Sequence, residues 1–323
     1  MIVHDILNEA THDFEAADIP SARLDAEVLL SFCLGCDHLE FYKNPDMTIS
    51  ETQLATFRNL IARRLQWEPV AYITSRKEFW TFVLEVNSSV LIPRPDTEVI
   101  VEETLEVAKK YESPLNEQPQ SNTGSVIQEM ASDLDSGLRR NDEKPRKSAP
   151  SVINILDIGT GSGAIAIALA LEITGAKVVA TDISEAAVNL AKKNAAALGL
   201  KEKIDFRLGN LFEPVDGFFD IIVCNPPYIS AHEYKKLPAG VKDYEPREAL
   251  WAGKSGLEFY EKLIYQAADF LQKNGWLLLE IGAKQEAGVR GIMEAAGFYD
   301  SIEMSRDYAG LPRVIKARRK VSG

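Results

Sequence analysis

A glycine-rich segment followed by an acidic residue is the first pattern that could bind a ligand. Between a strand-like apolar run and a predicted helix stand Asp157, Gly159, Thr160, Gly161, Ser162 and Gly163. Glycines let the backbone turn tightly, and free N–H groups at a helix start favour polar ligand groups. Asp182 ends the next predicted strand, where a carboxylate can accept hydrogen bonds from both hydroxyl groups of a ribose. The pattern indicates a cofactor containing adenosine and leaves open whether that cofactor is a dinucleotide.

The second pattern is Asn225-Pro226-Pro227-Tyr228, which follows another predicted strand. The Asn225 side-chain oxygen and the Pro226 carbonyl can accept the two N–H protons of a planar amide or aryl amine, while Tyr228 can stack on its flat face. Such a nitrogen is a weak nucleophile because its lone pair is delocalised. Two fixed acceptors would turn that lone pair toward an electrophilic methyl group. We therefore assign the catalytic role to Asn225, Pro226 and Tyr228, without a general base.

The elements that must position these patterns alternate between strand and helix. We predict strands at residues 152–158, 177–181, 204–208, 220–224, 276–281 and 313–318. Helices are predicted at residues 164–173, 185–198, 256–272 and 286–296. This alternation is typical of a mostly parallel α/β sheet covered on both faces, which binds ligands beyond the carboxyl ends of its strands.

The residues before this sheet are predicted to form mostly helices and a hairpin. Three helices are predicted at residues 5–18, after Ser21 and after Ser50, and the second is expected to bury Leu24, Val28, Leu29 and Phe32. Residues 79–86 (FWTFVLEV) alternate with period two, which predicts a hairpin, and residues 97–111 are expected to be helical. Residues 112–150 are polar without an apolar period, which indicates a disordered insertion. We therefore predict a helical domain at 1–75, a β-hairpin linker at 76–93 and an α/β domain at 94–323.

Composition narrows the class of protein. The chain has 36 basic and 48 acidic residues, a net charge of −12, which argues against general binding to nucleic-acid phosphates. The sequence has neither a secretory signal pattern nor an apolar run long enough for a membrane span, so we expect a cytoplasmic protein. Cys33 and Cys36 have a metal-like spacing but no second pair, so we interpret them as buried free thiols and expect no metal. Nothing in the sequence indicates an assembly, and a monomer is expected.

The two patterns together resemble the amino methyltransferases that use S-adenosyl-L-methionine. Five further segments narrow the resemblance to the bacterial release-factor glutamine methyltransferases, the HemK or PrmC family. They are PVAYI at 69–73, EF at 78–79, LIPRPDTE at 91–98, YEPREAL at 244–250 and DYAGLPRV at 307–314.

This resemblance implies methylation of the side-chain amide of the glutamine in the Gly-Gly-Gln motif of class I peptide chain release factors, which modulates translation termination. The methyl donor would be S-adenosyl-L-methionine and the product S-adenosyl-L-homocysteine. The implied fold is a Rossmann-like class I methyltransferase domain with a small helical N-terminal domain, which binds the release factor, and a β-hairpin linker.

The resemblance also implies residue roles. Residues 159–163 would hold the methionine end of the cofactor, Asp182 its ribose, and Asn210 and Leu211 its adenine. Residues 225–228 would bind the glutamine, and Asn225 would also contact the cofactor. Phe79 and Arg94 would shape the glutamine site. The sequence departs from the family at Asn210, where aspartate is usual, at Ser75, where glycine is common, and in the insertion.

Three alternatives stay open at this point. An adenine exocyclic amine in DNA or RNA would suit Asn225-Pro226-Pro227-Tyr228 equally well after base flipping, although the net acidity disfavours nucleic-acid binding. A non-catalytic binding module would keep only the cofactor fold. A nicotinamide-dependent dehydrogenase would need a positioned acid that we do not find.

Overall fold

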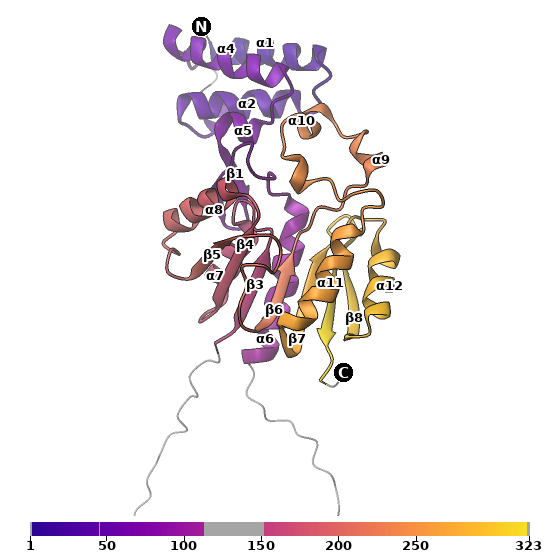
Figure 1. The fold of residues 1–323 in the computed structure, drawn as a ribbon. Coiled ribbons are helices and arrows are strands. Elements are labelled where there is room, and N and C mark those ends of the chain that lie inside the picture. Colours follow the sequence, from indigo (N-terminus) through magenta and orange to yellow (C-terminus); the bar gives the residue numbers. More distant parts are fainter. Residues whose placement is uncertain (1, 45, 113–151, 322–323) are drawn as a thin grey trace, which may run out of the picture.

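The computed structural model describes residues 2–44, 46–112 and 152–321, and its centre is a seven-stranded sheet (Figure 1). The strand order is β5-β4-β3-β6-β7-β9-β8. The strands are β3 (Asn154–Ile158), β4 (Lys177–Asp182), β5 (Ile204–Leu208), β6 (Phe219–Cys224), β7 (Leu271–Glu280), β8 (Tyr299–Arg306) and β9 (Pro312–Arg319). Neighbouring strands from β5 to β7 pair in parallel, whereas β9 pairs antiparallel with β7 and with β8. The predicted α/β class and mostly parallel sheet are confirmed.

Strand β8 is the one strand of this sheet that the sequence analysis missed. It lies at the sheet edge, where its side chains are largely half-buried or exposed, so its sequence lacks the apolar run that predicted the inner strands.

Helices cover both faces of the sheet, as predicted. The helices on one face are α6 (Glu98–Glu112), α7 (Ala164–Glu172) and α8 (Glu185–Ala197). The helices on the other face are α11 (Glu258–Phe270) and α12 (Glu286–Ala296). Between β6 and α11 the chain forms only the short helices α9 (Ala231–Tyr234) and α10 (Ala239–Lys242) and the 3-10 turn η2 (Arg247–Ala249). Two cores result, one under each helical layer, and the sheet separates them.

The N-terminal helices pack around a third core (Figure 1). They are α1 (Val3–Ala16), α2 (Ala22–Leu34), α3 (Leu39–Lys43), α4 (Glu51–Leu65) and α5 (Val70–Thr74), of which α3 and α5 were not predicted. Ser50 caps α4 in a capping box with Gln53, as its position suggested. The hairpin of β1 (Arg76–Phe79) and β2 (Phe82–Glu85) follows, which confirms the predicted hairpin.

The buried face of α2 was predicted wrongly. Leu24, Val28 and Phe32 are exposed by 59%, 37% and 44%. Leu29 is buried as predicted, but the other buried apolar residues are Leu30 and the small Ala22 and Ala26. Small side chains allow neighbouring helices to approach closely, and this packing turns the larger apolar residues outward. The result is an exposed apolar stripe of Leu24, Val28 and Phe32, called the α2 stripe below.

Two further expectations concern the thiols and the membrane. All three cysteines are free, but Cys33 and Cys36 are half-buried rather than buried, and Cys224 is buried. In the described parts of the chain, no helix has the length and apolar character needed to cross a bilayer. The predicted insertion at 112–150 lies outside the described residues except for Glu112, the last residue of α6.

We predict that the buried ion pair between Arg64 and Asp25 stabilises the helical domain. The Arg64 Nε donates to Asp25 Oδ2 at 2.7 Å, and both side chains are about 90% buried. Asp25→Ala would leave a buried guanidinium unpaired, so we expect the free energy of unfolding to fall by about 3 kcal/mol.

Urea unfolding followed by circular dichroism measures this change. Glu40→Ala is the matched control, because Glu40 pairs with Lys43 at the surface, where loss of a pair costs about 0–1 kcal/mol. Equal effects of the two substitutions would contradict the prediction.

Candidate active site

The two predicted patterns meet at the carboxyl ends of the central strands. Ile158 of β3 lies level with Thr181 of β4 on one side and with Cys224 of β6 on the other. Asp182 is the last residue of β4, and Asn225 directly follows the end of β6, so both flank the start of the glycine loop. This is the point where the strand order changes direction, from β3-β4-β5 on one side to β6-β7 on the other, and such a point is where open α/β sheets bind ligands.

The glycine loop has a backbone that other residues would strain. Gly159, Gly161 and Gly163 have φ angles of +72°, +56° and +87°. A Cβ atom on Gly163 would lie 3.0 Å from the Ile167 Cδ1 atom, whereas Cβ atoms on Gly159 and Gly161 would meet open space. The first turn is fixed by the Thr181 carbonyl, which accepts from the N–H groups of Gly159 and Thr160 at 2.8 and 2.9 Å. The loop is therefore rigid and open on the side where a ligand can approach.

Asp157 lies behind this loop as a fully buried carboxyl group. The Thr160 hydroxyl donates to its Oδ2 atom at 2.7 Å, whereas its Oδ1 atom has no partner among the described residues. Burial raises the pKa of Asp157 to about 7, and the hydrogen bond from Thr160 acts in the opposite direction. A buried carboxylate oxygen without a partner fits a cationic or N–H donor, such as the ammonium group of a methionine-derived ligand.

Asp182 lies on the other side of the loop. Its two oxygen atoms accept from the backbone N–H groups of Gly161 and Ser184, both at 2.9 Å. Burial raises the pKa of this carboxyl group as well, while those backbone hydrogen bonds lower it. Each carboxylate oxygen has a second lone pair, so acceptors remain for the hydroxyl groups of a ribose.

The predicted adenine residues lie next to Asp182. The Asp182 carbonyl accepts from the Gly209 N–H at 2.9 Å, which ties the following residue, Asn210, to the end of β4. Asn210 is exposed and its Nδ2 atom donates to Glu213 at 3.3 Å, so its Oδ1 atom is still able to accept. Leu211 is half-buried with a φ of +50°. The structure thus brings together all of the residues predicted to bind the cofactor.

Asn225 is held by a residue that the sequence analysis did not assign to the site. Its Nδ2 atom donates to the Thr97 hydroxyl at 3.2 Å. Thr97 is 4% exposed and ends the 3-10 turn η1 (Pro95–Thr97), directly before α6. Because the NH2 group of Asn225 bonds to Thr97, the side-chain oxygen of Asn225 is the atom that can accept a hydrogen bond from a ligand. The one sequence signal for Thr97 is the resemblance of the segment 91–98 to the family.

The rest of the Asn-Pro-Pro-Tyr segment is fixed by backbone contacts. Pro226 is buried, and Pro227 and Tyr228 are half-buried. The Gln285 Nε2 atom donates to the Tyr228 carbonyl at 2.9 Å, and no sequence signal pointed to Gln285. Burial raises the pKa of the Tyr228 hydroxyl, so this side chain is neutral near pH 7.

Phe79 packs against another aromatic ring, whereas Arg94 forms an ion pair. Phe79 is 2% exposed in the hairpin, with its ring centroid 6.1 Å from that of Phe82. Arg94 forms an ion pair with the buried Glu245, which also accepts from the Ile92 N–H at 3.2 Å. Arg94 therefore joins the segment before α6 to the connection between β6 and α11. The roles of both residues stay predictions.

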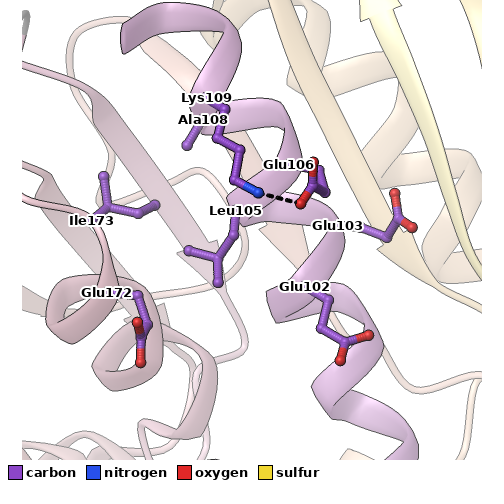
Figure 2. Close-up of a pocket in the computed structure, with 8 residues that line it drawn as sticks. All are labelled: Glu102, Glu103, Leu105, Glu106, Ala108, Lys109, Glu172 and Ile173. Carbon is purple, nitrogen blue, oxygen red and sulfur yellow. Dashed lines mark hydrogen bonds and ion pairs between the residues drawn. The ribbon is translucent and has the colours of Figure 1, made fainter.

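A separate hollow lies along α6 and the end of α7 (Figure 2). Four glutamates line it, and each side chain has a partner. Glu102 accepts from Tyr308, Glu103 pairs with Lys316, Glu106 pairs with Lys109, and Glu172 accepts from Trp80. Its lining includes none of the predicted site residues, and we assign no ligand to it.

Comparisons with known proteins agree with this geometry. Residues 5–74 match the family model of the PrmC N-terminal domain, and residues 146–239 match the methyltransferase small domain. The release factor glutamine methyltransferase of Geobacter sulfurreducens is 37% identical over 301 residues, which are 93% of this chain and 90% of that protein. The protein of the same name from Koribacter versatilis is 34% identical over the full length of both chains.

Solved structures support the fold alone. The catalytic domain of hMettl16, in complex with an RNA hairpin of the MAT2A 3′UTR, has a TM-score of 0.52 at 16% identity and covers 82% of this chain and 83% of that one. The predicted Rossmann-like class I methyltransferase fold, with its helical N-terminal part and hairpin, is confirmed. Because relatives above 30% identity extend over nearly the whole chain, the chain belongs to the PrmC family of release factor glutamine methyltransferases.

Proposed function

We propose that this chain transfers a methyl group from S-adenosyl-L-methionine to the side-chain amide nitrogen of the glutamine in the Gly-Gly-Gln motif of a class I release factor. The observation that carries the proposal is the hydrogen bond from Asn225 Nδ2 to Thr97, which leaves the Asn225 oxygen free to accept. A primary amide offers two N–H donors, and the Pro226 carbonyl is the second acceptor, with no N–H of its own beside it.

The residues at the glycine loop fit the cofactor. Residues 159–163 would face its methionine end, with the unpartnered oxygen of Asp157 available for the ammonium group. Asp182 would accept from the ribose hydroxyls, and the exposed Asn210 would accept from the adenine amine. When bound, the cofactor supplies an electrophilic methyl group on a sulfonium.

The chain's own residues then act by orientation. Holding both N–H groups of the glutamine in the plane of its amide directs the nitrogen lone pair out of that plane. The neutral ring of Tyr228 can lie against the flat face of the amide. The amide nitrogen becomes acidic only as it gains the methyl group, so no base has to remove a proton beforehand. We propose that a metal ion has no role, because two fixed acceptors supply the orientation.

Mass spectrometry of the release factor tests this proposal. After incubation with enzyme and cofactor, we expect the tryptic peptide containing Gly-Gly-Gln to gain the mass of one methyl group. Asn225→Ala should lower turnover by about 100-fold, because a lost polar contact to the reacting group costs this much. Cofactor affinity should be largely intact, since Asn225 is bonded to Thr97 and not to the glycine loop.

Asn8→Ala, an exposed asparagine on α1, is the matched control and should keep full turnover. The proposal fails if the enzyme labels an adenine-containing duplex and leaves the release factor unlabelled. That result would favour the adenine methyltransferase alternative.

Cofactor affinity should depend on the ionisation of Asp157. In the free protein the pKa of this carboxyl is raised to about 7, and a bound ammonium would lower it. Below pH 7 binding must therefore release a proton, and affinity should fall by up to about tenfold per pH unit. Titration calorimetry between about pH 7 and pH 5.5 measures the slope.

Asp157→Asn should bind the cofactor about tenfold more weakly at pH 7, because it loses a charged partner, and should lack this slope. If the slopes of wild type and variant coincide, Asp157 does not face the ammonium group.

We further propose that the helical domain, residues 1–75, binds the body of the release factor through the α2 stripe. Monomeric proteins seldom leave a row of large apolar side chains exposed, and Leu24, Val28 and Phe32 follow one line along α2. The double variant Val28→Ser with Phe32→Ser should raise KM for the whole release factor by about tenfold, the effect of losing an interface contact of moderate strength.

Turnover of a short Gly-Gly-Gln peptide should not change in this double variant, because such a peptide is too short to reach α2. Thr52→Ala with Thr56→Ala, on the exposed face of α4, is the matched control. An equal KM for double variant and wild type would contradict the assignment of this surface.

A further inference from the structure

Glu280 lies beside Asn225 at the carboxyl end of the neighbouring strand. Strands β6 and β7 pair in parallel with Cys224 level with Leu279, so the next residues, Asn225 and Glu280, also stand level. Side chains alternate along a strand, and Val223 and Leu278 pack into the core under α6, α7 and α8. Asn225 and Glu280 therefore point toward the same helical layer, where α6 begins.

Thr97, the last residue of η1, interacts with both of them. Thr97 accepts a hydrogen bond from the Asn225 Nδ2 atom at 3.2 Å. Its hydroxyl also lies close enough to the Glu280 carboxyl group to lower the pKa of that group by hydrogen bonding, as does the hydroxyl of Tyr228. Glu280 is 1% exposed, and its Oε2 atom has no partner in the described structure. Burial, helped by the charge of Asp96, raises the pKa of Glu280 to about 7, whereas hydrogen bonding from Thr97 and Tyr228 and the charge of Arg313 lower it. A buried carboxyl group thus faces the hydroxyl that holds the catalytic asparagine.

The two ends of an asparagine amide have nearly the same shape but opposite hydrogen-bonding character. If the Asn225 amide were rotated by half a turn, its NH2 group would face the NH2 group of the substrate, and two donors would oppose each other. Some contact behind Asn225 must therefore select one orientation. Among the residues that the structure describes, the Asn225 NH2 group donates one hydrogen bond, the bond to Thr97.

We propose that Thr97 and Glu280 are positioning residues that fix which end of the Asn225 amide faces the substrate. A hydroxyl group has one proton, and the Glu280 carboxylate accepts it. Thr97 then presents only lone pairs to Asn225, so only the NH2 end of the Asn225 amide can bond to it. The Asn225 oxygen is thereby directed toward the substrate. This inference rests on the proposed transfer to an amide, and it adds the source of the asparagine's orientation.

A double-mutant cycle on the full chain tests the inference, with turnover of the release factor as the readout. Thr97→Val keeps the shape and removes the hydroxyl, so we expect kcat to fall by about tenfold with cofactor affinity unchanged. Thr97→Ser keeps the hydroxyl and should retain kcat within about twofold. In the Asn225→Ala background no amide has to be oriented, so Thr97→Val should lower kcat by less than about twofold.

Glu280→Gln provides an independent variant, because its carboxamide can donate to Thr97 and so competes with Asn225. We expect kcat to fall by about threefold to tenfold, and less than additively with Thr97→Val. If Thr97→Val lowers kcat equally in the wild-type and Asn225→Ala backgrounds, or leaves kcat unchanged, the inference is overturned. The proposed function would still hold as long as the wild type methylates the glutamine. A wild-type enzyme that leaves the glutamine unmethylated would overturn the proposed function and, with it, this inference.

Discussion

The parallel register of the central strands is the constraint on which the site depends. It places the ends of β3, β4, β6 and β7 at one edge, so that residues far apart in the chain become neighbours. An amide nitrogen is too weak a nucleophile to react without orientation, and orientation requires acceptors whose positions do not drift. A packed sheet with helices on both faces provides such positions, because its side chains cannot shift without disturbing two cores. Asn225 and Pro226 directly follow the last residue of β6. The packed strand therefore restricts the movement of their oxygen atoms, the proposed acceptors.

Two buried carboxyl groups lie at the same edge of the sheet, and their burial lowers the stability of the folded chain. Asp157 and Glu280 are buried, and each has an oxygen atom without a partner among the described residues. Both pKa values are raised to about 7, above the values near 4 expected in the unfolded chain. The folded state therefore binds more protons than the unfolded state between about pH 4 and pH 7, and these two groups lower stability as the pH rises through that window. Buried polar atoms that lack a hydrogen-bond partner lower folding stability. They are typical of functional sites, where such an atom can bind a ligand or orient a neighbouring side chain.

The sequence predicted those features whose signal is local. The inner strands were predictable because buried parallel strands are continuous apolar runs, and the glycine loop because strand, glycines and helix follow one another in the chain. The buried face of α2 was not predictable from the sequence. Helical spacing does not say which of two apolar stripes packs inward when alanines allow a neighbouring helix to approach closely. Thr97 was missed as a partner of Asn225 because the two residues are 128 positions apart. A contact of that kind exists only once η1 and β6 have been brought together by the fold.

The switch in strand order divides the site into two halves with different tasks. The residues predicted to hold the cofactor lie on β3 and β4 and on the turn after β5. The proposed acceptors for the amide lie beyond β6, next to Thr97 before α6 and to Glu280 on β7. The two halves touch along the pair of β3 and β6, where Ile158 meets Cys224. Each half has its own buried carboxyl group, Asp157 behind the loop and Glu280 behind the asparagine. Under the proposed function, binding of the methyl donor and orientation of the acceptor amide would therefore depend on separate residues, and the pairing of β3 with β6 would fix how the two halves lie relative to each other.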